Sequence, residues 1–134
     1  MEFSDEKIRM PIGPIVYGCF VTLFWLLCIT ILMTIATEFG WTGIIAPYQH
    51  NLLLALGYVA LVAGSVTAGL KSNSHGWLVG LGIGLGNSII LLILDIITGG
   101  GAIHWGIFLA KTLIGAFIGL FGGVIGVNIS GSRK

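Results

Sequence analysis

Asp95 and Lys111 are the ionisable residues that fall closest to the interior of long apolar stretches. At 1.5 Å per helical residue, Asp95 lies about 27 Å beyond Trp77, and Lys111 reaches a similar level counted back from Asn128. A structural ion pair explains both residues, as does a Lys111 side chain that extends to the membrane interface. The sharper alternative is an ion- or proton-binding site, because ionisable groups inside membranes often mark pathways.

A pathway has to continue across the membrane, and the sequence offers few polar groups for it. Glu38 and His104 could join Asp95 and Lys111 on one face. Further inward, we expect only four polar side chains: Thr67, Asn87, Ser88 and Thr112. The sequence therefore predicts at most a thinly lined route.

Other reactive residue types do not gather into a catalytic or metal-binding pattern. Cys19 and Cys28 are nine residues apart, which is about 13 Å along a helix, too far for a disulfide within it. The three histidines are scattered in loops or at the edges of apolar stretches: His50, His75 and His104. No serine or cysteine has an evident histidine partner, and no carboxylates face each other. We expect no enzyme, no catalytic residue, no metal and no cofactor.

The composition excludes a water-soluble domain. Of the 134 residues, 56% are hydrophobic and 8% are charged, and the mean hydropathy is +1.05. Soluble domains carry roughly 25% charged residues. The net charge of +1 supplies no basic patch for nucleic acid. The expected partner is the lipid bilayer, and residues 1–134 are expected to form one domain.

Four apolar stretches are each long enough to cross a bilayer core, which takes about 20 residues. They cover approximately residues 13–37, 51–70, 77–97 and 104–128. Lipid permits only helices or closed barrels, and these stretches lack the apolar–polar alternation of barrel strands. The sequence predicts an all-α integral membrane protein with four transmembrane helices, packed as two helical hairpins.

Basic residues predict the orientation of these helices. Five of the six lie in segments that four spans place on one side: Lys7, Arg9, Lys71, Arg133 and Lys134. Lysine and arginine are enriched on the cytoplasmic side of membrane proteins. We therefore expect a multi-pass protein of the cell (plasma) membrane with both termini in the cytoplasm.

Glycine, with 22 residues, is concentrated in the apolar stretches at helical spacing. The positions expected to pack helices together are Gly64, Gly80, Gly84, Gly115, Gly119, Gly122 and Gly126. Stripes of small residues let helix backbones approach closely in lipid. They fit tight packing within the chain, and contact between copies in an oligomer is the alternative.

The second and fourth apolar stretches also align with each other. Four small residues stand 58 positions before four others: Gly57, Gly64, Ser65 and Ala68 before Gly115, Gly122, Gly123 and Gly126. This offset suggests two tandem helical hairpins with the same orientation.

Several segments resemble a known family. They are Gly64–Lys71, His75–Leu81, Lys111–Leu113 with Gly115 and Ala116, and Gly122–Asn128. Together they resemble the YrzE-like family of small four-helix bacterial membrane proteins, a domain of unknown function, over about residues 10–130. Family members often carry more basic residues in the turn that here contains Leu70 and Ser72–Ser74, which argues against an anionic-lipid contact there. The resemblance implies a cell-membrane location and a four-helix fold, and it brings no activity.

Two functions fit these observations. The first is a non-enzymatic structural or accessory subunit that acts through helix packing in a homo-oligomer or a larger membrane complex. The second is a small channel or transporter with an ion- or proton-binding site around Asp95 and Lys111.

Overall fold

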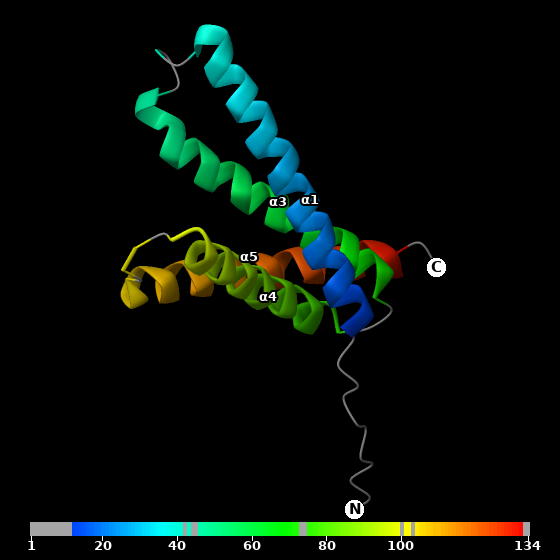
Figure 1. The fold of residues 1–134 in the computed structure, drawn as a ribbon. Helices are drawn as coiled ribbons and strands as arrows, with labels where there is room; N and C mark the ends of the chain where they lie inside the picture. The colour runs from blue at the N-terminus through cyan, green and yellow to red at the C-terminus, as the bar shows by residue number, and fades with distance from the viewer. Residues whose placement is uncertain are drawn as a thin grey trace, which may run out of the picture.

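The protein is all-helical over the residues that its computed structural model describes, which are 12–41, 43, 46–72, 75–99, 101–102 and 104–132 (Figure 1). Its four long helices are α1 (Ile12–Ala36), α3 (Gln49–Lys71), α4 (Gly76–Ile97) and α5 (Trp105–Gly131). Two short helical turns, η1 (Thr37–Trp41) and η2 (Ala46–Tyr48), lie between α1 and α3. All four long helices are long and apolar enough to cross a membrane. The prediction of an all-α protein with four such helices is confirmed.

Local backbone chemistry ends the helices near the predicted positions. At the end of α3, the Ser72 N–H donates to the carbonyls of Ala68 and Gly69, at 3.0 and 3.2 Å. After α4, Gly99 has a φ of 73°, a conformation that glycine adopts without steric penalty. These features close α3 and α4 so that each chain reversal is short.

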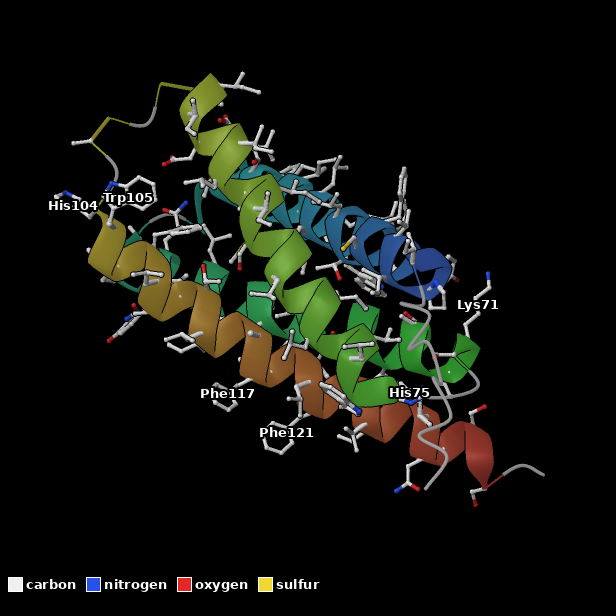
Figure 2. The ribbon with its side chains drawn as sticks, turned by 90° about the horizontal axis from the view of Figure 1, so that it is seen from below. Lys71, His75, His104, Trp105, Phe117 and Phe121 are labelled. Atoms are coloured by element: carbon white, nitrogen blue, oxygen red, sulfur yellow. The ribbon has the colours of Figure 1, made fainter. Side chains whose placement is uncertain are left out.

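The helices pack closely at one end of the molecule and separate at the other. α4 and α5 pack against each other from the start of α4 to Gly84 and separate toward the loop that joins them (Figure 2), and α1 and α3 also diverge toward their loop (Figure 1). α5 also packs along α3, and α1 contacts both α3 and α4. The buried apolar core, formed by Leu61, Ala68, Val79 and Ile83, lies where the four helices meet.

The outer surface of the bundle consists of large apolar side chains. Phe117 and Phe121 point away from the helices (Figure 2) and are 61% and 64% exposed. Similar side chains cover α1, where Phe20 is 73% exposed. Such a surface matches lipid tails rather than water, so the fold indicates a multi-pass membrane protein.

One end of the bundle carries Lys71, which alone among the five basic residues used to predict orientation lies in the described part of the chain. Lys71 and His75 lie at the end where α5 also finishes (Figure 2), and Lys71 Nζ is 4.2 Å from the centroid of the Tyr17 ring. This cation–π contact joins α3 to the start of α1. The other basic residues used to predict orientation, Lys7, Arg9, Arg133 and Lys134, lie outside the described residues, so the cytoplasmic location of this end stays a prediction.

Candidate functional site

Glycine brings the backbones of α4 and α5 into direct contact. A methyl group added at Gly80 would overlap the Gly119 carbonyl, and one added at Gly119 would overlap the Gly80 carbonyl. A methyl group at Gly84 would lie 2.6 Å from the Gly115 carbonyl oxygen. Since nothing larger than hydrogen fits at these positions, these glycines hold the second hairpin together.

Three further predicted packing glycines join α3 to its neighbours. A methyl group at Gly122 would lie 2.8 Å from Ser65 Cβ, and one at Gly126 would overlap the Val66 carbonyl. Gly64 faces the Thr22 hydroxyl on α1. These glycine stripes therefore make contacts inside one chain.

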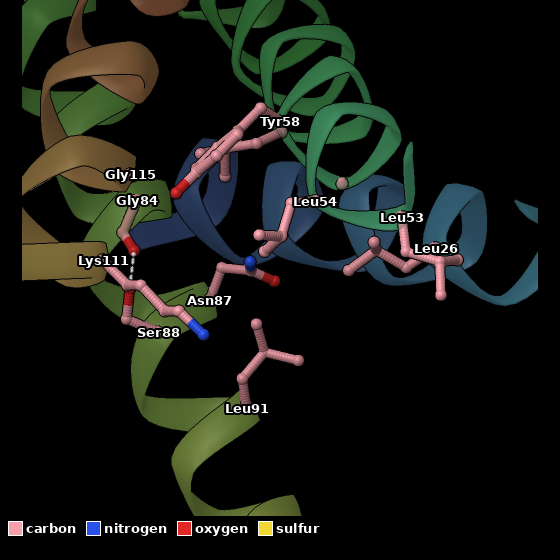
Figure 3. A pocket seen from close by; sticks show the side chains of 12 residues that line it. Leu26, Leu53, Leu54, Tyr58, Gly84, Asn87, Ser88, Leu91, Lys111 and Gly115 are labelled. Atoms are coloured by element: carbon pink, nitrogen blue, oxygen red, sulfur yellow. Dashed lines mark hydrogen bonds between the residues drawn. The ribbon is translucent and has the colours of Figure 1, made fainter. Parts of the chain in front are cut away.

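Gly115 is looser than the others and marks the place where the bundle opens. The nearest atom to an added methyl group there is Ser88 Oγ, at 3.7 Å. Next to it lies a cavity of about 210 Å³ that receives side chains from all four helices, including Leu26, Tyr58, Asn87 and Lys111 (Figure 3).

A second cavity of about 510 Å³ continues from the first toward the α4–α5 loop. Leu54, Ser88, Leu91 and Lys111 line both cavities. The larger one adds polar groups near the loop, namely Asp95, His104 and Thr112. We call these two adjoining spaces the hairpin cavity, because they lie between the α1–α3 and α4–α5 hairpins.

Asn87 is the most buried polar side chain that lines the hairpin cavity. It is 7% exposed, and it points into the space beside Leu54, Leu91 and Lys111 (Figure 3). No described residue donates a hydrogen bond to Asn87 Oδ1. A buried polar group without a partner costs free energy, and in a native protein it calls for an explanation.

The hydroxyl groups near Asn87 differ in their hydrogen bonding. Ser88 Oγ donates to the Gly84 carbonyl at 2.9 Å, whereas Thr112 Oγ1 is buried without a hydrogen-bond partner among the described residues. Thr67, expected as part of an inward route, instead donates to the Gly64 carbonyl at 2.9 Å and does not line the cavity. The predicted polar groups therefore gather only partly.

The structure brings Asp95 and Lys111 to the walls of the same space. Both are exposed side chains that line the larger part of the hairpin cavity. Within the described residues, no ion pair of 4.0 Å or less joins them. Their pairing stays a prediction. His104 joins them at the cavity, and Glu38, on η1, does not line it.

The hairpin cavity is closed on the side away from the α4–α5 loop. One helical turn below Asn87, Ile83 is fully buried, and Val79 is fully buried one turn further. The Gly80–Gly119 contact seals α4 against α5 at the same level. The space thus ends blind, an arrangement that suits holding a molecule better than passing one.

Reasoning from the sequence missed several residues of this site. Tyr58 and Leu54 on α3 and Leu26 on α1 line it, and only Tyr58 carried a signal, as a hydroxyl-bearing aromatic in mid-span. No group of three or more metal-ligating side chains occurs within the part of the chain that the structure describes. The polar groups at hand are one amine, one carboxylate, one imidazole, one carboxamide and hydroxyls.

Comparison with known proteins gives one match. A family described as a protein of unknown function (DUF3792) matches residues 11–126, which is most of the chain. No curated protein and no solved structure matches the sequence. The YrzE-like name and a bacterial source stay predictions.

Proposed function

The chain therefore belongs to the DUF3792 family, and we propose that it is a non-enzymatic accessory protein of the membrane that binds another membrane component in the hairpin cavity. The observation that carries this proposal is a blind cavity reached by side chains of all four helices. Its polar groups include one carboxylate and one amine, with no hydrogen bond between them among the described residues. That set supports recognition better than acid–base chemistry.

We expect this accessory role to be exercised in a homo-oligomer or a larger membrane complex. The glycine stripes do not supply that contact, because they already pack α3, α4 and α5 against each other. What remains for a partner is the surface of large apolar side chains, such as those on α1. An assembly would then form through side-chain packing rather than through close backbone approach.

A photoreactive amino acid in place of Leu54 tests whether the hairpin cavity is occupied in membranes. Leu54 lines both parts of the cavity, so illumination should give an adduct of one defined mass. The matched control is the same replacement at Leu113, which is 59% exposed on α5 and lines no part of the cavity. Identical adducts at both positions would mean that the cavity binds nothing selectively.

The second candidate function is a small channel or transporter, favoured by Asp95 and Lys111 on the walls of one space. Ion or proton flux through purified protein in liposomes, lost on Asp95→Asn, would support it. Silent liposomes together with a stoichiometric partner that co-purifies in mild detergent would support the accessory role. The blind end of the cavity favours the accessory role.

A further inference from the structure

We propose that the hairpin cavity binds the head group of a zwitterionic phospholipid of the ethanolamine type, with the phosphate at Lys111 and the ammonium at Asp95. This inference rests on the proposed function and names the membrane component that the cavity receives. Its basis is a pair of separated opposite charges and apolar walls that open within one leaflet.

The charges of the hairpin cavity are complementary to such a head group. Lys111 lines both parts of the cavity, whereas Asp95 lines only the larger part near the loop. The two described side chains form no ion pair within 4.0 Å, so each is left to interact with a ligand. A phosphate accepts hydrogen bonds from the Lys111 ammonium, and a primary ammonium donates to the Asp95 carboxylate. Such charge-assisted bonds are stronger than neutral ones.

The depth of the hairpin cavity matches one leaflet of a bilayer. Asn87 lies ten residues before Ile97, where α4 ends, and this is about 15 Å at 1.5 Å per residue. A bilayer core is about 30 Å thick, so the cavity reaches roughly to the midplane from the side of the α4–α5 loop. Lys111 can extend toward the interface by its flexible chain. A lipid of that leaflet can therefore place its phosphate near the interface and its tails deeper.

The walls of the hairpin cavity are suited to acyl chains. Leu26, Leu53 and Leu54 line it from the diverging α1 and α3, and Leu91 lines it from α4. A free phosphate would leave these apolar surfaces uncovered, whereas the tails of a phospholipid would cover them. A phospholipid is thus a better match than a soluble phosphate compound.

Asn87 lies deeper than the lipid head group, at a level that the acyl chains would reach. It is deeper than Lys111 in the cavity, 7% exposed, and has no partner for Oδ1 within the described residues. An apolar helix from another protein in this space would cover Asp95 and Lys111 without satisfying either charge.

Lipid binding to the purified full chain tests the proposal. Native mass spectrometry would measure retention of phosphatidylethanolamine, phosphatidylcholine and phosphatidylglycerol with identical acyl chains. We expect the ethanolamine lipid to be retained most strongly. Asp95→Asn should weaken it roughly tenfold, the effect of one charge-assisted hydrogen bond, and bring it level with the glycerol lipid. Lys111→Gln should weaken all three lipids, because all carry the phosphate.

Matched variants show whether these losses are specific to the cavity. Glu38→Gln removes an exposed carboxylate from η1, and Lys71→Gln removes a cation at the opposite end of α3. Neither lines the hairpin cavity, so both should bind lipid as the unchanged protein does. Leu54→Trp should fill the cavity and displace the lipid without altering any charge.

Two results would overturn the proposal. One is equal retention of the three lipids with no effect of Asp95→Asn, in a variant whose melting temperature is unchanged. The other is an adduct at position 54 that consists of protein rather than lipid. In the second case the cavity still binds a membrane component, so the proposed function survives while the lipid assignment fails. The absence of any adduct at position 54 would contradict both the lipid assignment and the proposed function.

Discussion

At the scale of single residues, Asn87 is a buried polar group that lowers stability. Its carboxamide is buried with Oδ1 unpaired among the described residues, so Asn87→Leu should stabilise the lipid-free protein by about 1–3 kcal/mol. Thermal unfolding of delipidated protein in detergent measures this change. The same variant should still retain phosphatidylethanolamine, because the charges of Asp95 and Lys111 are unchanged.

A neighbouring hydroxyl provides the comparison for Asn87. Ser88 Oγ already donates to the Gly84 carbonyl at 2.9 Å, so Ser88→Ala should change stability by less than about 1 kcal/mol, typical of a bond within one helix. If Asn87→Leu destabilises the lipid-free protein while Ser88→Ala does not, the carboxamide has a stabilising partner.

The α4–α5 contact gives the first prediction at the scale of elements. Gly119→Leu would push a side chain into the Gly80 carbonyl, so the two backbones must separate. The expected loss of stability is about 3 kcal/mol or more, at the upper end for overpacking. Unfolding in denaturing detergent would measure it. Gly106→Leu, on the same helix with no atom within 4 Å of the added methyl group, should be nearly neutral, and equal losses would contradict the packing role.

A repeat of helix pairs relates the contacts of the two hairpins. The 58-residue offset places Gly18, Thr22 and Leu26 of α1 at the positions of three glycines in α4: Gly76, Gly80 and Gly84. The contacts follow the same offset, since Leu26 meets Gly57 and Gly84 meets Gly115. At equivalent positions, α1 therefore carries progressively larger side chains where α4 has glycine. These side chains hold α1 away from α3 toward the loop that joins the two helices.

The repeat predicts that the size of residue 26 sets the opening of the first hairpin. Leu26→Gly should bring α1 closer to α3, and the distance between spin labels at Ile35 and Leu52, both exposed on these helices, should shorten. Leu23→Gly is the matched control, because it also removes a leucine from α1 but at a position that lines no part of the cavity. An unchanged distance in the Leu26 variant would show that the divergence has another cause.

These comparisons show which parts of the molecule the sequence predicts. The four helices follow from long apolar stretches, because membranes admit few alternatives, and Gly80, Gly84 and Gly119 were recognisable by spacing. The α1 contact through Gly18 and Thr22 was missed, since a single glycine followed by threonine makes no stripe. The hairpin cavity was missed for a different reason: it depends on how far the helices diverge, which the spacing of residues along single helices does not give.

At the scale of the whole molecule, the positions of the two ends decide which leaflet faces the hairpin cavity. Lys71 and His75 lie at one end of the bundle, and the cavity opens toward His104 at the other (Figure 2). Since basic residues favour the cytoplasmic side, the cavity should open in the outer leaflet. A lipid bound there would be drawn from the outer face of the membrane.

Labelling of single cysteines in intact cells tests this orientation. With Cys19 and Cys28 replaced by alanine, a membrane-impermeant maleimide should label Ala102→Cys in the α4–α5 loop and leave His75→Cys unlabelled. Both positions are exposed, so a difference in reaction reflects the side of the membrane and not burial. After the membrane is permeabilised, His75→Cys should react as well, which confirms that the thiol is present. The reverse pattern would contradict the predicted orientation and place the hairpin cavity in the cytoplasmic leaflet, where the same charges would select from that leaflet's lipids.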